Sequence, residues 1–152
     1  MTHIYIKTID MKYNEKKRLQ IGLRRLYTGQ APSKEILNLI GTDRDTFVNH
    51  VNAYRISGMT DENFGKEWTL DHIVPVDIFD VSDEEQLKIC YNYHNIMPMF
   101  LNDNRIKGAS SHFSLIKLNH LKNNPNINAE MVNKLITECE RHNDKIYAKY
   151  LV

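Results

Sequence analysis

The segment Lys66–Val74, KEWTLDHIV, constrains the fold most, because its apolar and polar residues alternate as in one strand of a sheet. A strand points successive side chains to opposite faces, so Asp71 and His72 look away from each other. Pro75 ends strand pairing, because its nitrogen carries no hydrogen. We therefore do not expect a simple ion pair between this acid and the neighbouring imidazole.

The composition is typical of one globular domain. The chain has 152 residues, of which 41% are hydrophobic and 26% charged, enough for one sizeable core. No run approaches the ~20 apolar residues of a membrane helix, and the first residues do not read as a signal peptide. Two cysteines, Cys90 and Cys139, fit a reducing compartment better than a disulfide framework. We expect a cytoplasmic protein without a membrane contact.

Charge is unevenly distributed, although the formal net charge is only +1. Residues 1–30 hold seven Lys/Arg against two Asp/Glu, residues 31–89 five against twelve, and residues 90–152 eight against five. A basic end beside an acidic middle suits a polyanion-binding protein whose acids serve another purpose. The same distribution equally suits an ordinary solvated surface. The net positive charge of the chain is far below that of a strongly basic nucleic-acid binder.

The first third of the chain is predicted to be helical. Residues 13–27 form a basic amphipathic helix with three leucines on one stripe. Ser33 caps a short helix, KEILNLI, and Thr42 or Asp43 caps a longer one that runs to Gly58. The pair has the outline of a helix-turn-helix. We expect core packing rather than DNA reading, since acids at the start of its second helix repel phosphate.

The remaining chain is predicted to hold a second short strand and further helices. Ser82 caps a short acidic helix, and a loop over Tyr91–Asn95 leads into the strand Ile96–Phe100, which a helix follows. A polar connector, NHLKNNPNINA, then precedes a long amphipathic helix from about Ala129 to Tyr150. The centre of the chain is therefore a strand, a crossover, a strand and a helix.

Three short blocks carry a resemblance to a known family. DHIVP, HN and N-x-x-K-G follow in this order, with 23 positions from His72 to Asn95 and nine from Asn95 to Asn104. Blocks at these separations resemble the HNH endonucleases and their ββα-metal motif, in particular small members from phages and large DNA viruses. The resemblance covers roughly residues 36–110. It implies an α+β fold, with a ββα-metal (His-Me finger) core, flanking helices, an N-terminal helical hairpin and a long C-terminal helix.

We accordingly divide the chain into three parts. Residues 1–57 hold the basic helix and the helical hairpin, which either extend a DNA contact or brace the motif. Residues 58–112 are the nuclease core, and residues 113–152 are a C-terminal helical extension.

The residue types themselves suit the hydrolysis of a phosphodiester, independently of the family resemblance. Hydrolysing a phosphodiester needs an activated water, a cation beside the phosphate and help for the departing oxygen. A neutral His72 can take the proton from water, whereas Asp71 and the amide oxygen of Asn104 suit a hard cation. Because the neighbours diverge, Asp71 can face the cation while His72 faces the water. The amide of Asn95 then remains to hold either the imidazole ring or the loop.

The resemblance assigns roles to the matching positions. They are general base for His72, metal ligand for Asp71 and Asn104, central structural asparagine for Asn95, and phosphate contact for Lys107 and Arg105. The third letter of the motif is Asn104 rather than His, which makes the chain an H-N-N variant. With two oxygen ligands, one divalent cation, Mg²⁺ or Mn²⁺, is expected rather than Zn²⁺.

A structural zinc is an alternative that we weigh separately. Cys90-x-x-x-His94 and Cys139-x-x-His142 could together supply a Cys₂His₂ set. Many HNH proteins carry paired C-x-x-C ligands, which this sequence lacks, and Cys139 lies on an apolar helix face where a buried thiol is ordinary. We therefore do not expect structural zinc.

The sequence thus favours a metal-dependent HNH endonuclease that nicks or cuts double-stranded DNA, in the host cytoplasm if a phage or virus encodes it. Taken singly, each site residue has an ordinary structural explanation. Their occurrence together, at the spacings of the HNH motif, favours the nuclease. Two alternatives stay open, a non-cleaving DNA-binding module on the HNH frame and a nuclease subunit active only within a viral packaging complex. One ββα site cuts one strand, so a homodimer and viral packaging proteins are the candidate protein partners.

Overall fold

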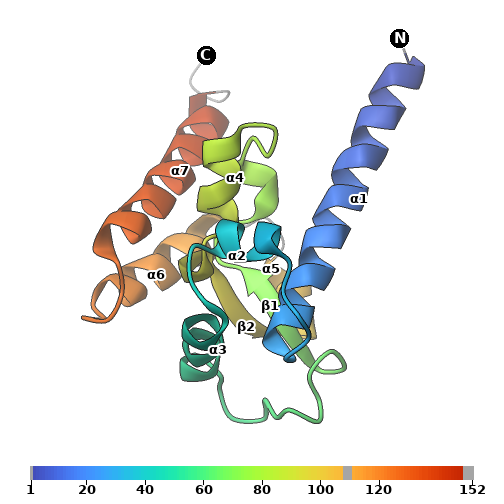
Figure 1. Cartoon of the computed structure of the whole chain (residues 1–152). Helices are drawn as coiled ribbons and strands as arrows, with labels where there is room; N and C mark the ends of the chain where they lie inside the picture. Colours follow the sequence, from blue (N-terminus) through green and yellow to red (C-terminus); the bar gives the residue numbers. More distant parts are fainter. Residues whose placement is uncertain (1, 108–110, 149–152) are drawn as a thin grey trace.

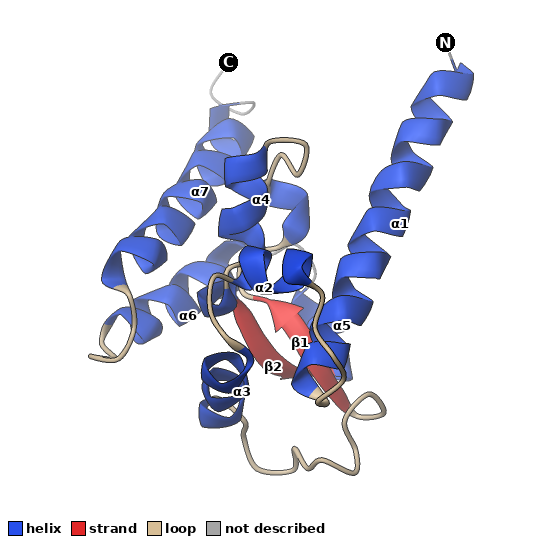
Figure 2. Cartoon of the chain, in the orientation of Figure 1, coloured by secondary structure: helices blue, strands red, loops and turns tan. Residues whose placement is uncertain are grey.

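The computed structural model describes residues 2–107 and 111–148, with the side chains of residues 13–104 and 114–142. Within these residues the fold combines seven α-helices and two 3₁₀-helices with one two-stranded antiparallel sheet (Figures 1 and 2). The elements follow in the order α1 (Thr2–Tyr27), α2 (Lys34–Ile40), α3 (Arg44–Ala53), β1 (Trp68–His72), η1 (Val76–Ile78), α4 (Glu84–Tyr91), η2 (Tyr93–Asn95), β2 (Ile96–Phe100), α5 (Leu101–Lys107), α6 (Ser111–Lys122) and α7 (Ala129–Ala148).

The sheet consists of β1 and β2, which pair in a register that sets His72 opposite Ile96. The predicted bounds of β2 are confirmed. The predicted strand over Lys66–Val74 is too long at both ends. Its first two residues lie in a turn, since the N–H groups of Lys66 and Glu67 donate to the carbonyl of Asn63 at 3.1 and 3.0 Å. Beyond His72 the chain bends away from the strand.

Helix α5 begins immediately after β2. The N–H of Leu101 donates to the carbonyl of Glu67 at 2.9 Å, which ties the start of α5 to the turn before β1. α5 packs against both strands. The order β1, β2, α5 therefore forms one compact unit, with α4 in the crossover between the strands (Figure 1).

The N-terminal helices agree with the prediction in kind and differ in length. α1 begins at Thr2 rather than at residue 13, and its first part projects away from the other elements (Figure 1). Ser33 caps α2, as predicted, and Asp43 caps α3 by accepting the N–H of Thr46 at 2.8 Å. α3 ends at Ala53 and not at Gly58. The hairpin packs inward, with α2 on α4 and α3 on α1 and β2.

The second half holds the larger corrections. Asp83, not Ser82, caps α4, because its carboxylate accepts the N–H of Gln86 at 2.9 Å. The predicted loop over 91–95 is the end of α4 and the turn η2. α6 was not predicted as a helix, and the predicted connector begins inside it. Its apolar residues lie on several faces, with Leu118 buried and Ile116 53% exposed, so no amphipathic stripe marks it.

α7 begins at Ala129, as predicted, and is described to Ala148, so its predicted end at Tyr150 lies outside the described residues. The carboxamide oxygen of Asn128 accepts the N–H groups of Glu130 and Met131 at its start, at 3.0 and 3.2 Å. Among the described residues, no helix combines the length and the apolar character needed to cross a membrane.

One buried cluster joins the three predicted parts of the chain. It draws on α1, α2 and α3, on both strands, and on α4, α6 and α7. Trp68 belongs to it and has no exposed surface, and its indole N–H donates to the carbonyl of Thr60 at 2.8 Å. The strand that carries Asp71 and His72 is therefore anchored in the shared core.

Candidate functional site

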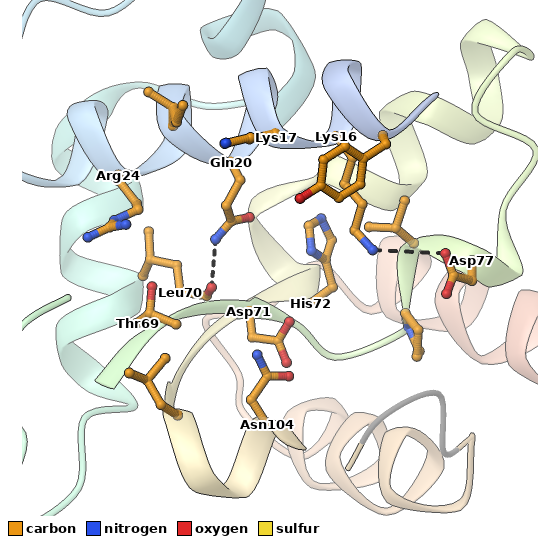
Figure 3. A pocket seen from close by; sticks show the side chains of 15 residues that line it. Lys16, Lys17, Gln20, Arg24, Thr69, Leu70, Asp71, His72, Asp77 and Asn104 are labelled. Carbon is orange, nitrogen blue, oxygen red and sulfur yellow. Dashed lines mark hydrogen bonds and ion pairs between the residues drawn. The ribbon is translucent and has the colours of Figure 1, made fainter. Parts of the chain in front are cut away.

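A cavity of about 690 Å³ opens between α1 and the unit made by β1 and α5. Of the four predicted site residues whose side chains the structure describes, three border it, Asp71, His72 and Asn104 (Figure 3). On the opposite wall, α1 contributes the cations Lys16, Lys17 and Arg24 and the carboxamide of Gln20. Groups that the sequence separates by up to 88 positions (Lys16 to Asn104) thus meet around one space.

The two neighbours at the end of β1 point in different directions. Asp71 points toward Asn104, which α5 presents, whereas His72 turns toward α1 (Figure 3). Both nevertheless border the same cavity. The predicted divergence of the two side chains is therefore present in the structure.

The imidazole of His72 is enclosed, with 5% of the residue exposed. Its ring meets the ring of Tyr91 edge to face, with 4.8 Å between centroids and 86° between planes. Burial raises the pKa of the Tyr91 phenol, so this neighbour stays neutral. Tyr91 thus limits the orientation of the imidazole without placing a charge beside it.

Asn95 lies outside the cavity and is fully buried. Its carboxamide oxygen accepts the N–H of Val74 at 2.8 Å, and its amide nitrogen donates to the carbonyls of Cys90 at 2.8 Å and Val74 at 3.2 Å. Its backbone carbonyl accepts the N–H of Ile73 at 2.7 Å. Of the two predicted tasks, holding the ring or holding the loop, the hydrogen bonds of Asn95 serve the loop after His72.

Two further side chains support the site and were not predicted. Gln20 on α1 donates to the carbonyl of Leu70 at 2.8 Å, which attaches α1 to the edge of β1 that β2 does not cover. Ser114 on α6 donates to the carbonyl of Ile73 at 2.6 Å. The recurrence of polar residues at positions 17, 20 and 24 was the available signal for α1, because this spacing marks one helix face.

The predicted phosphate contacts Arg105 and Lys107 belong to α5 by their backbone. Their side chains lie outside the described part of the structure.

The predicted alternative of a Cys₂His₂ zinc set meets a specific obstacle at His94. Its Nδ1 donates to the carboxamide oxygen of Asn92 at 2.7 Å, and its Nε2 accepts the N–H of Asn128 at 3.1 Å, so both ring nitrogens are engaged. In the described chain, no three or more His, Cys, Asp or Glu residues are grouped to hold a metal. The pair Asp71 and Asn104 contains only one residue of these types, so this absence does not bear on it.

We expect acid to destabilise the fold between pH 6.5 and about 4, because burial lowers the pKa of His94 from 6.5 to about 4. Burial also lowers the pKa of His50, which donates to the carbonyl of Ile96 at 2.9 Å. Across this window the unfolded chain binds more protons than the native one, so the free energy of unfolding falls as the pH falls. His94 alone contributes a loss of up to about 3 kcal/mol.

Urea unfolding measured from pH 7 to pH 4 tests this expectation. His94→Gln should flatten the dependence of unfolding free energy on pH, whereas the exposed His120→Gln should leave it unchanged. The same pH dependence in wild type and His94→Gln would refute the assignment.

Two proteins of Acanthamoeba polyphaga mimivirus are similar to the chain. "Uncharacterized protein L426" is 30% identical over 98 residues, which are 64% of this chain and 43% of that protein. "Uncharacterized protein L246" is 31% identical over 90 residues, which are 59% of this chain and 39% of that protein. The aligned part is thus about two fifths of the length of these relatives. No protein-family model matches the chain, and no solved structure matches it significantly.

Proposed function

We propose that the protein is a metal-dependent HNH endonuclease that nicks or cuts double-stranded DNA. The observation that supports this most is the meeting of Asp71, His72 and Asn104 at one cavity (Figure 3). The acid and the imidazole come from the first strand and the asparagine from the helix after the second strand, which is the order that a ββα-metal motif requires. The cations of α1 on the facing wall suit a phosphate-bearing substrate.

The residues present fit one hard divalent cation. The carboxylate of Asp71 and the carboxamide of Asn104 point toward each other, and oxygen donors of these kinds suit Mg²⁺ or Mn²⁺. When bound, the cation would stabilise the charge that develops on the phosphate and on the departing 3′ oxygen.

His72 is assigned the proton transfer. A neutral imidazole takes a proton from the attacking water, and the edge-on ring of Tyr91 keeps the imidazole oriented toward the cavity. Asn95 does not contact the reacting groups and acts as a positioning residue, because its carboxamide holds the loop after His72. Hydrolysis would leave a 5′ phosphate and a 3′ hydroxyl.

The test is cleavage of supercoiled plasmid. With Mg²⁺ or Mn²⁺ we expect nicked or linear product, and we expect EDTA to abolish it. Residues that only support metal ligands cost about 10–100-fold when removed, so Asp71→Asn and Asn104→Ala should each cost more than about 100-fold, partly recovered at higher metal concentration. Asp45→Asn is the control, because it removes one carboxylate charge at an exposed site on α3, away from the cavity. No cleavage under any divalent metal, on any DNA form, would refute the enzymatic proposal.

Both predicted alternatives have distinct outcomes in the same assay. If Asp71→Ala keeps every measurable function and salt-sensitive DNA binding is the only activity, the protein is a binding module. The viral origin of the relatives favours testing the packaging alternative, in which cleavage appears only beside neighbouring viral gene products.

A further inference from the structure

α1 forms the wall of the cavity that faces Asp71 and Asn104 (Figure 3). Gln20 attaches the helix to β1 through the carbonyl of Leu70. Lys17 and Arg24 lie three residues before and four residues after Gln20, a spacing that keeps all three on one helix face. Both cations border the same cavity as the proposed catalytic groups.

Most neighbouring cations are already paired with acids. Arg18 pairs with Glu15 at 2.6 Å and Glu35 at 2.7 Å, and Lys16 pairs with Asp77 at 3.9 Å. In the described part of the chain, Lys17 and Arg24 take part in no ion pair. Two uncompensated positive charges therefore face a water-accessible cavity, which favours an anionic ligand there.

Arg24 is also held in place by uncharged neighbours. Its guanidinium carbon lies 5.6 Å from the ring centroid of Phe64. The same guanidinium lies against Gly65, where an added Cβ would stand 2.5 Å from its terminal nitrogen. The contact therefore depends on Gly65 having no side chain, and the guanidinium keeps its hydrogen-bond donors for another partner.

We infer that Lys17 and Arg24 bind two phosphate groups of the DNA strand that is cut, so that this strand lies along α1; the inference rests on the proposed nuclease function. An α-helix rises 1.5 Å per residue, so their separation of seven positions spans about 10 Å. One strand of B-DNA advances 3.4 Å per nucleotide along the duplex axis. Because the strand winds around that axis, its successive phosphates stand farther apart than this rise, so the two phosphates lie within about three nucleotides of each other.

Bracing of the fold does not require these two charges. The buried residues Leu19, Leu23 and Leu26 hold α1 in the core, and Gln20 holds it to β1. Arg25 provides a matched control, because it is the next cation on the same helix and borders a different cavity, beside Pro32.

The experiment measures binding of duplex DNA by the full chain, in a His72→Ala background that prevents turnover, at several salt concentrations. Lys17→Gln and Arg24→Gln should each raise Kd about tenfold, and each should lower the slope of log K against log salt by about 1. Arg25→Gln should change Kd less than about twofold. Arg24→Lys should restore most of the slope, because it restores the charge.

A second measurement locates the contacts on the strand. Once the cut is mapped, a neutral methylphosphonate replaces one phosphate at a time. Wild type should lose affinity at two positions within about three nucleotides of each other, and Arg24→Gln should lose it at only one of them.

The outcomes separate the two proposals. If all three Gln variants weaken binding equally, or Lys17→Gln and Arg24→Gln do not weaken it, the assignment to α1 is overturned while the nuclease can stand. If binding falls with thermal stability and Arg24→Lys rescues neither, α1 only braces the fold and the assignment is also overturned. If wild type neither binds nor cuts DNA, the proposed function itself fails.

Discussion

His72→Ala is expected to lower the single-turnover rate of DNA cleavage by about 10²–10⁴-fold, the contribution typical of a positioned general base. The imidazole borders the cavity, is almost fully enclosed and meets Tyr91 edge-on. The substitution leaves Asp71 and Asn104 in place, so binding of metal and DNA should change little. Cleavage of supercoiled plasmid at saturating enzyme, with a parallel DNA-binding titration, measures the two effects separately.

Two control variants keep this expectation falsifiable. His72→Asn retains a polar side chain beside Tyr91 and should lose the rate to a similar extent, because a carboxamide cannot take the proton. His120→Ala removes an exposed imidazole on α6 and should cleave as wild type does. A folded His72→Ala protein that cleaves at the wild-type rate would exclude His72 as the base.

Local sequence patterns were sufficient where an apolar or amphipathic run begins directly after polar residues. β2 and the start of α7 have the predicted bounds, since apolar residues and flanking polar residues mark both. β1 was predicted too long, because the turn at Asn63 and the bend after His72 are set by backbone hydrogen bonds that no alternation reveals. α6 was missed because its apolar residues do not lie on one face.

The candidate site was predictable only as far as its motif extends. The spacing of Asp71, His72 and Asn104 led us to expect one site, and all three border one cavity. The facing wall depends on a contact between Gln20 and the carbonyl of Leu70, fifty positions apart, which is a tertiary contact without a local pattern. The charge excess of residues 1–30 suggested a polyanion contact but not where the cations point.

Asn95→Ala is expected to destabilise the protein by about 3–5 kcal/mol. Its carboxamide is fully buried and serves the N–H and carbonyl of Val74 and the carbonyl of Cys90. Each buried polar group left without a partner costs about 1–3 kcal/mol. Urea unfolding followed by the fluorescence of Trp68, the single tryptophan, measures the loss.

The same variant separates a structural role from a positioning one. Asn92→Ala is the matched control, because Asn92 is also buried in the turn before β2, yet its carboxamide serves His94 instead of the loop after His72. Both variants should lose stability. Under conditions where both are folded, only Asn95→Ala should lower kcat, with KM little changed, because only there does the backbone after His72 lose its support. Equal rates in the two variants would mean that Asn95 holds the fold together without positioning the base.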